Sequence, residues 1–215
     1  MRKVLGLLLL FFVSTLVSFG QKAKPVFEVV PLGVYGGIDE RNLSAYLVAP
    51  IGTKEYVCLD AGTVHSGIEK AIEKGTFSVP SSTVLRQYIK GYCISHAHLD
   101  HVSGLIINSP ADSTKTVYAI APAMKMMQNH YFNDQTWANF GDEGLGKPLK
   151  KYHFETLSFG KTIPISNTSM TVQAFPLSHV NPYESTAFLI KKGNNAVLYL
   201  GDTGPDAVEK TTNLA

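Results

Sequence analysis

The chain has 215 residues, of which 45% are hydrophobic and 17% are charged, a balance typical of one folded globular domain. Its 19 Lys and Arg residues nearly balance its 17 Asp and Glu residues. A nearly neutral surface gives little long-range attraction for a polymeric phosphate backbone or an anionic membrane. We therefore exclude nucleic acid as a partner and expect any anion that the protein handles to be small.

The first twenty residues have the pattern of a secretory signal peptide. Arg2 and Lys3 precede an apolar stretch over residues 4–17, which small or neutral residues close at positions 18–20. A membrane anchor is the alternative, but the stretch is shorter than the roughly 20 apolar residues that a spanning helix needs. We predict a signal peptide over residues 1–20 and a mature domain over residues 21–215. The protein would then be periplasmic or secreted, without stable membrane insertion after cleavage.

Strand-like and helix-like runs alternate through the first 130 residues. Strands are predicted over residues 27–31, 45–49, 56–62, 92–95 and 116–120. Helices are predicted over residues 67–74 and 122–130, with a further one starting at residues 102–108. Because a glycine-rich turn separates the first two strands, the chain opens like a mostly antiparallel sheet. The methionines at positions 124, 126 and 127 are expected to pack on the core.

The second half contains a long loop and three clear strands. Residues 133–146 are loop-like, and a loop of this length in a compact domain is often functional. Strands are predicted over residues 170–175, 186–190 and 196–200. The Gly-Asn-Asn turn at residues 193–195 predicts that the last two form a hairpin.

Two cysteines, Cys58 and Cys93, lie in strand-like runs that end just before candidate site residues. An exported protein can form a disulfide, but one pair of cysteines is not a disulfide framework. We expect buried free thiols, with a single disulfide as the alternative.

Four potential metal ligands fall within six residues: His96, His98, Asp100 and His101. A strand end followed by a turn can direct His96 and His98 towards one metal while Asp100 and His101 face a second. Imidazole and carboxylate ligands suit Zn²⁺, Mn²⁺ or Fe. The alternative is a loop of solvated histidines, but such a density of ligand-type residues favours metal binding.

Two later residues extend the pattern, and each follows a predicted strand. His179 alone would more often be a structural or surface histidine, and Asp202 alone could be a turn or helix-capping residue. Their order after the cluster of residues 96–101 makes both of them candidate ligands.

The order His-x-His-x-Asp-His, then His, then an Asp that closes a strand resembles the metallo-β-lactamase superfamily. Within it, residues 96–110 are similar to the signature of the class II cyclic-nucleotide phosphodiesterases, including the closing Ser-Pro. Residues 33–47, 129–133 and 137–140 also resemble that family. The resemblance covers nearly the whole mature chain and implies an α/β fold, the αββα sandwich of the metallo-β-lactamase type.

The resemblance also implies a metal site and a reaction. His96, His98 and His179 would bind one divalent metal, Asp100 and His101 a second, and Asp202 would bridge them, with Zn²⁺ the expected metal. A hydroxide held by two metals would attack the phosphorus of a 3′,5′-cyclic nucleotide, expected to be cyclic AMP, and yield a 5′-nucleotide. Asp100, or water, would give the leaving 3′ oxygen its proton.

The remaining site residues are less readable. Tyr131, Trp137 and Phe140 could stack on a purine or serve the core, and His130 could reach the phosphate or only cap its helix. By resemblance, Asp60 would orient a ligating histidine, because such histidines usually donate their other N–H to a carboxylate. The two remaining histidines, at positions 65 and 153, are expected on the surface.

One departure from the superfamily pattern stands out. The pattern supplies a further histidine ligand after the bridging aspartate, but no histidine follows His179. We therefore expect the C-terminal part of the domain to be missing and the second metal to have one protein ligand fewer. The alternatives are another hydrolase of this fold, such as a lactonase, β-lactamase or arylsulfatase-like enzyme, or a non-catalytic metal- or nucleotide-binding protein. The sequence does not choose between cyclic AMP and cyclic GMP, and it leaves a homodimer open.

Overall fold

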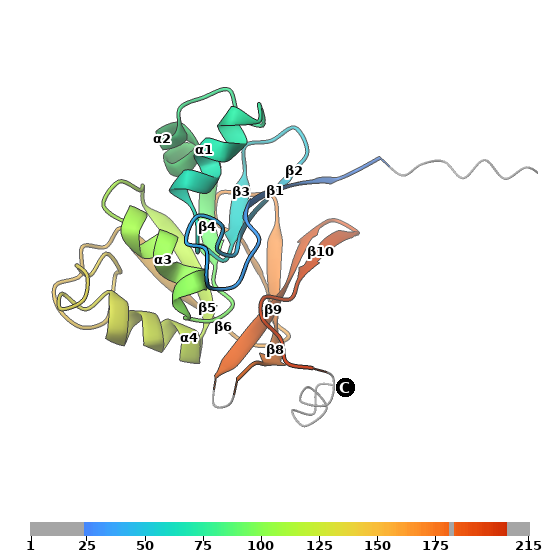
Figure 1. Cartoon of the computed structure of the whole chain (residues 1–215). Helices are drawn as coiled ribbons and strands as arrows, with labels where there is room; N and C mark the ends of the chain where they lie inside the picture. The colour runs from blue at the N-terminus through green and yellow to red at the C-terminus, as the bar shows by residue number, and fades with distance from the viewer. Residues whose placement is uncertain (1–23, 181–182, 206–215) are drawn as a thin grey trace, which may run out of the picture.

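A computed structural model describes residues 24–180 and 183–205 of the chain (Figure 1). The predicted signal peptide, residues 1–20, lies outside the described residues, as does the segment from residue 206 to the end. Within the described ranges, no helix combines the length and the apolar character needed to cross a membrane.

A six-stranded mixed sheet forms the first half of the fold. Its strands, in spatial as well as chain order, are β1 (Phe27–Gly33), β2 (Ala45–Pro50), β3 (Tyr56–Leu59), β4 (Ile89–Cys93), β5 (Lys115–Ile120) and β6 (Tyr152–Leu157). The first three are antiparallel, as predicted, and β3 to β6 are parallel. Strand β6 was not predicted; it is an edge strand whose buried residues are Tyr152, Phe154 and Leu157.

Helices connect the parallel strands and cover one face of this sheet (Figure 1). They are α1 (His65–Glu73), α2 (Ser81–Thr83) with the π-helical turn η1 (Val84–Tyr88), α3 (Leu99–Asn108), and α4 (Ala121–Met126) with the π-helical turn η2 (Met127–Tyr131). Parallel strands need such crossovers because a tight turn cannot join them. Met124 and Met127 are buried and Met126 packs partly buried against the core, which confirms the expected role of these methionines.

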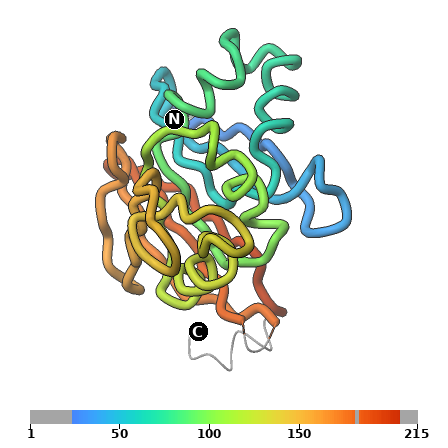
Figure 2. The backbone as a smooth tube through the Cα atoms, turned by 90° about the vertical axis from the view of Figure 1, so that its left-hand side faces the viewer, coloured from blue at the N-terminus to red at the C-terminus, as the bar shows by residue number. Residues whose placement is uncertain are grey.

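A four-stranded antiparallel sheet packs on the other face. Its spatial order is β10 (Asn195–Tyr199), β9 (Glu184–Lys192), β8 (Thr171–Ser178) and β7 (Thr162–Pro164). The predicted hairpin is confirmed, because β9 and β10 pair in antiparallel register. Seen from the helix side, the orange and red strands of this sheet lie behind the first one (Figure 2). The described residues thus form three layers of the expected αββα sandwich, with helices on the first sheet.

Both cysteines are free and buried, as expected. Cys58 is paired with Tyr92 and Leu59 with Cys93 across the parallel strands β3 and β4. Because paired residues point to the same face and neighbours in a strand to opposite faces, the two thiols lie on opposite sides of the sheet. This register excludes a disulfide between them.

The topology directs several chain segments to one edge of the molecule. The carboxyl ends of parallel strands share an edge, which is where open α/β sheets place their ligands. The chain leaves β3 at Asp60 and β4 just before the histidine cluster. In the second sheet β8 and β10 run in the same direction, since each is antiparallel to β9, and they end just before His179 and Asp202.

Helix α3 docks closely on the turn that follows β3. The Ala61 N–H donates to the His101 carbonyl at 2.7 Å, and the Leu105 N–H donates to the Ala61 carbonyl at 3.1 Å. Gly104 permits this approach, because a Cβ there would lie 2.7 Å from the Ala61 oxygen and 2.8 Å from the Gly62 oxygen. The helix that carries Asp100 and His101 is thereby fixed against the end of β3.

We predict that Gly104→Ala destabilises the protein although alanine is the better helix former. The helical preference of alanine over glycine contributes about 1 kcal/mol, whereas overpacking against backbone typically costs about 1–3 kcal/mol. Because the backbone atoms of the turn cannot move aside easily, we expect the upper part of this range, and urea denaturation should show a free energy of unfolding lowered by about 2 kcal/mol. Ile107→Ala, at an exposed position of the same helix, is the control and should change it by less than about 0.5 kcal/mol. A variant as stable as the parent would contradict the tight packing.

Candidate metal centre

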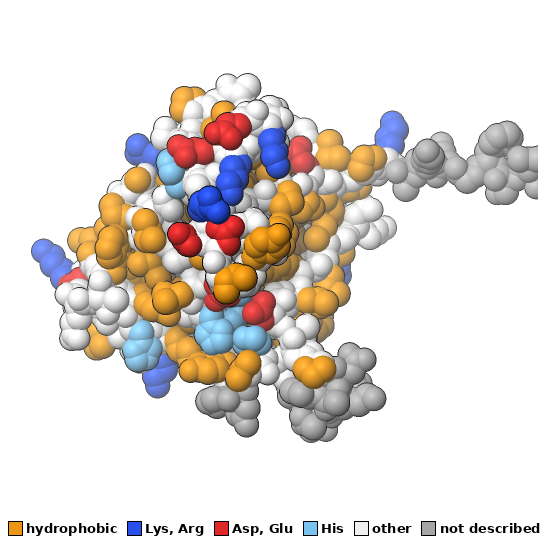
Figure 3. All heavy atoms as spheres, viewed as in Figure 1, with side chains coloured by type: hydrophobic (Ala, Val, Ile, Leu, Met, Phe, Trp, Pro, Cys, Tyr) orange, Lys and Arg blue, Asp and Glu red, His pale blue; other side chains and the backbone are white. Residues whose placement is uncertain are grey.

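Three segments far apart in the sequence, residues 96–101, His179 and Asp202, bring their histidines and carboxylates together. Figure 3 shows pale-blue histidine side chains gathered beside red carboxylates on the face seen in Figure 1. The described part of the structure contains two groups of three residues that share one member. Within each group the ligand atoms all lie within 4.8 Å of one another, a spacing that suits a metal ion. The groups are His96, His98 and His179, and His96, His101 and Asp202.

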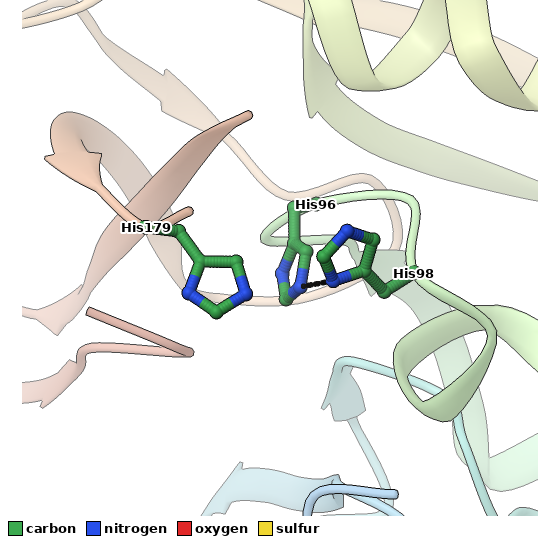
Figure 4. Close-up of side chains that lie close together, drawn as sticks. All are labelled: His96, His98 and His179. Atoms are coloured by element: carbon green, nitrogen blue, oxygen red, sulfur yellow. Dashed lines mark hydrogen bonds between the residues drawn. The ribbon is translucent and has the colours of Figure 1, made fainter. Parts of the chain in front are cut away.

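The first group is made of three imidazoles that face one another (Figure 4). His96 and His98 come from the loop after β4, and His179 follows β8. The His96 Nε2 and His98 Nδ1 atoms are 3.0 Å apart, and the His179 ring centroid lies 4.9 Å and 5.2 Å from those of His96 and His98. Three convergent imidazole nitrogens are a common ligand set for Zn²⁺.

The second group adds the buried His101 and the half-buried Asp202. Asp202 Oδ1 lies 3.4 Å from His101 Nε2, and its other oxygen, Oδ2, lies 3.7 Å from His179 Nε2. One carboxylate therefore reaches both groups. His96 also belongs to both groups, although the sequence pattern predicted it in the first group alone.

Asp100 adjoins the second group from the first turn of α3. Its Oδ2 atom lies 3.5 Å from His101 Nε2 and accepts a hydrogen bond from the Gly37 N–H at 2.9 Å. The glycine-rich loop after β1 therefore holds this carboxylate against the site. Asp100 belongs to neither of the two tight groups, and its predicted role as a ligand stays a prediction.

The buried carboxylate of Asp60 organises the site from behind. Its Oδ1 atom accepts the Ser95 N–H at 2.7 Å. Its Oδ2 atom accepts the Ser95 hydroxyl at 2.8 Å, His101 Nδ1 at 2.7 Å and the Tyr199 hydroxyl at 2.6 Å. Asp60 has a φ of 53°, in the left-handed region that aspartate tolerates better than most residues.

These hydrogen bonds set the tautomers of two histidines. A carboxylate only accepts, so His101 Nδ1 carries the proton that it donates to Asp60. The Ser95 hydroxyl donates to Asp60, so its oxygen is available to accept the proton of His96 Nδ1, 3.0 Å away. In the neutral form of each ring, Nε2 therefore carries the lone pair and is directed into the site.

His101 Nε2 gives the most direct indication of a metal ligand. It is buried and, among the residues that the structure describes, has no hydrogen-bond partner; its neighbours are the carboxylates of Asp100 and Asp202. An unpartnered buried nitrogen is costly, whereas a divalent cation placed among these groups would satisfy the nitrogen and both carboxylates. The residues present therefore fit a divalent metal.

In the metal-free site, the histidines differ widely in pKa. Burial and the nearby His101 lower the pKa of His96 to about 4. Burial and His179 also lower the pKa of His98. Burial lowers the pKa of His101 as well, but the Asp202 and Asp60 carboxylates outweigh this effect and raise it to about 10. The His101 imidazole in turn lowers the pKa of Asp202 to about 2.

The aromatic candidates divide into one at the site and two away from it. The Tyr131 hydroxyl donates to the Ala97 carbonyl at 2.9 Å, beside the cluster. The Trp137 indole N–H donates to Ser109 at 3.0 Å, at the opposite end of α3 from the cluster, and the Phe140 ring packs against Lys151. Trp137 and Phe140 thus serve the core rather than the site.

The remaining histidines lie at the surface. His65 is paired with Glu69 and His153 with Asp142, both with side chains more than half exposed, which confirms the expectation for these two. His130 is exposed near the end of η2.

Several residues at the site were not predicted. They are Ser44, Ser95, Tyr199, the Gly37 N–H, and Tyr183, whose ring centroid lies 4.8 Å from that of His98. Each acts through tertiary proximity or a backbone group, so no local motif marks it. Only Ser95, directly before the first histidine, was within reach of the sequence pattern.

Comparison with solved structures identifies the fold. The chain resembles the crystal structure of unliganded yeast PDE1, with a TM-score of 0.74 at 20% identity over 84% of this chain and 66% of that one. It also resembles the metallo-β-lactamase fold protein YhfI from Bacillus subtilis, with a TM-score of 0.59 at 18% identity over 86% of this chain and 66% of that one. Fold and site together define a protein of the metallo-β-lactamase fold with a cluster suited to divalent metal.

The sequence comparisons then identify the family. The profile of the class-II cAMP phosphodiesterases matches residues 26–215, and the chain belongs to this family. A probable 3′,5′-cyclic-nucleotide phosphodiesterase of Yersinia pestis is 42% identical over 219 residues, 97% of this chain and 64% of the relative. The 3′,5′-cyclic-nucleotide phosphodiesterase of Aliivibrio fischeri is 42% identical over 217 residues, 96% of this chain and 65% of the relative. The chain thus spans slightly less than two thirds of the length of these relatives.

We predict that Asp60→Asn weakens metal binding. An amide offers one acceptor oxygen, and its NH₂ group would face hydroxyl and imidazole donors, so the orientation of His101 is lost. Partners of this kind typically contribute 10–100-fold to metal affinity, and we expect a loss of about this size in competition titrations with a chelator. Asp142→Asn is the matched control because it alters an Asp–His pair at the surface. Equal affinities of the two variants would contradict the role of Asp60.

We also predict that metal binding releases a proton near pH 8. With its pKa raised to about 10, His101 is protonated there in the metal-free protein, whereas His96, with a pKa of about 4, is not. Metal must displace the His101 proton, so apparent affinity should rise with pH up to about 10. In the metal-free protein, this raised pKa stabilises the fold fully below about pH 6.5, and the contribution is lost as pH rises through 10.

Calorimetric titrations in buffers of different ionisation enthalpy measure this release. About one proton per His101-bound metal is expected. His65→Ala should leave the release unchanged, since that side chain is exposed and paired with Glu69. Metal binding at pH 8 without proton uptake by the buffer would show that His101 is already neutral.

Proposed function

We propose that the protein hydrolyses 3′,5′-cyclic nucleotides to 5′-nucleotides, with cyclic AMP as the expected substrate. The observation that carries the proposal is a pair of ligand groups that share His96, with Asp202 of the second group reaching His179 of the first, in a chain of the class-II cAMP phosphodiesterase family. The printed names of the relatives from Yersinia pestis and Aliivibrio fischeri support the same substrate class.

The proposed site holds two divalent metal ions, with Zn²⁺ expected. His96, His98 and His179 would bind the first, His101 and Asp100 the second, and Asp202 would lie between them. The reach of Asp202 towards both His101 and His179 supports this assignment. Two such ions lower the pKa of bound water and stabilise the charge on the attacking and leaving oxygens of a phosphoryl transfer.

The reaction exchanges one bond to phosphorus for another. A bond forms between phosphorus and a water oxygen, the bond from phosphorus to the 3′ oxygen breaks, and one proton of the water passes to the 3′ oxygen. Asp100 is the residue we assign to this transfer. Its carboxylate borders the second ligand group and is fixed by the Gly37 N–H, a geometry that supports proton exchange at one defined point.

Two tyrosines line the approach to His98. The Tyr183 ring packs edge-on against His98, and Tyr131 is held by its hydroxyl on the Ala97 carbonyl. Two aromatic rings therefore lie beside the ligands, and aromatic rings favour a substrate that carries a base. We further propose that the protein is exported to the periplasm or the exterior, because residues 1–20 have the pattern of a secretory signal peptide.

The test is hydrolysis of 3′,5′-cyclic AMP by the metal-loaded full-length protein, with the product identified by chromatography. We expect 5′-AMP from the parent, no turnover after removal of the metal by a chelator, and a loss of more than about 100-fold in kcat/KM for His98→Ala. His153→Ala, which removes an exposed histidine paired with Asp142, is the matched control and should retain full activity.

Other products or substrates would redirect the proposal. Release of 3′-AMP would overturn the assignment of the leaving oxygen. No turnover of cyclic nucleotides by protein with bound metal would overturn the proposal and favour lactone, β-lactam or sulfate-ester substrates. Tight binding of cyclic AMP without turnover would favour a non-catalytic nucleotide-binding protein.

A further inference from the structure

The phenol of Tyr199 connects the second sheet to the back of the metal centre. Tyr199 is the last residue of β10, whereas Asp60 follows β3 in the first sheet. The Tyr199 hydroxyl lies 2.6 Å from Asp60 Oδ2 and 2.8 Å from the Ser44 hydroxyl. Since a carboxylate only accepts, the phenol donates to Asp60, and Ser44 can donate to the phenol oxygen.

The ring of Tyr199 is held by packing as well. It belongs to the partly buried hydrophobic side chains packed on the core, and its centroid lies 5.6 Å from that of Tyr46 in β2. The hydroxyl therefore has one accessible place, between Ser44 and Asp60. A group so fixed can define the position of the strand that carries it.

The chain beyond Tyr199 leads directly to a ligand. Three residues later, Asp202 contacts His101 and His179. Between them Gly201, with a φ of 61°, packs so closely on Ser95 that a Cβ would lie 2.8 Å from the serine Cβ. The end of β10 is thus docked on the first sheet at Asp60 and at Ser95, the two residues that orient His101 and His96.

We propose that Tyr199 is a positioning residue for the metal centre. Its phenol donor fixes the Asp60 carboxylate that orients His101, and at the same time sets the place of Asp202 at the end of β10. This hydrogen bond, together with the packing of Gly201 on Ser95, then holds the ligands of the two sheets in register. This inference rests on the divalent-metal site of the proposed function and is independent of the substrate.

The test is the Tyr199→Phe variant of the full chain, which removes one hydroxyl and keeps the ring. We expect affinity for Zn²⁺, measured by chelator competition, to fall about 10-fold, within the range for groups that orient ligands. We also expect the visible absorption spectrum of the Co²⁺-loaded variant to differ from that of the parent, because the ligand geometry changes. Neither measurement requires turnover, so a failure of cyclic AMP hydrolysis would leave this test intact.

Tyr92→Phe is the matched control. It also removes a hydroxyl that donates to a buried aspartate, Asp112, at 2.6 Å, but this aspartate lies in the turn between α3 and β5, away from the metal ligands. Both variants should lower the thermal midpoint, whereas only Tyr199→Phe should change Zn²⁺ affinity and the Co²⁺ spectrum. If the two variants lose stability alike and bind metal like the parent, Tyr199 is only structural and the inference is overturned.

A double-mutant cycle keeps the inference testable if Tyr199→Phe folds poorly. Ser44→Ala removes the hydroxyl that contacts the phenol and should lower Zn²⁺ affinity by a smaller factor than Tyr199→Phe. Combining Tyr199→Phe or Ser44→Ala with Asp60→Asn should produce no further loss beyond that of Asp60→Asn, because residues that act through one group are not additive. Additive losses would contradict action through Asp60.

Discussion

The carboxylate of Asp60 is buried completely and accepts four hydrogen bonds, from the Ser95 N–H, the Ser95 hydroxyl, His101 and Tyr199. A buried charge is tolerated only when it is well paired, and here the pairing itself determines the site. Asp60 orients the His101 ring directly and the His96 ring through Ser95, so that the Nε2 atoms of both rings are directed to the same space. Removing the charge would release both rings and the end of β10 together.

The fold supplies the geometry that this carboxylate needs. Strands β3 and β4 are parallel neighbours, so Asp60 and the loop that begins at Ser95 leave the sheet side by side. The second sheet adds His179 and Asp202 from two strands that run in one direction. A mixed sheet facing an antiparallel one therefore gathers ligands that are separated by up to about half of the chain.

The sequence predicted what is continuous along the chain. The histidine cluster, the strand before it and the hairpin of the second sheet are local patterns, and His179 and Asp202 could be added because each follows a strand. Tyr199, Ser44 and the Gly37 N–H could not be predicted, since a phenol, a hydroxyl and a backbone amide gain their roles only from tertiary neighbours. Trp137 shows the opposite case: its loop was a candidate binding loop, but its indole is hydrogen-bonded to Ser109 on the core.

The order of the ligands along the chain has a consequence for synthesis. Residues 96–101 are synthesised together with the strands of the first sheet, whereas His179 and Asp202 are synthesised later, with the strands of the second sheet. Until those strands dock, the nascent chain presents an open half-site, and each group of ligands in the structure requires one residue from the later segment. A cation held by either group would therefore bind only after the second sheet has docked. It would link the two sheets, so its release would be coupled to unfolding of the later segment.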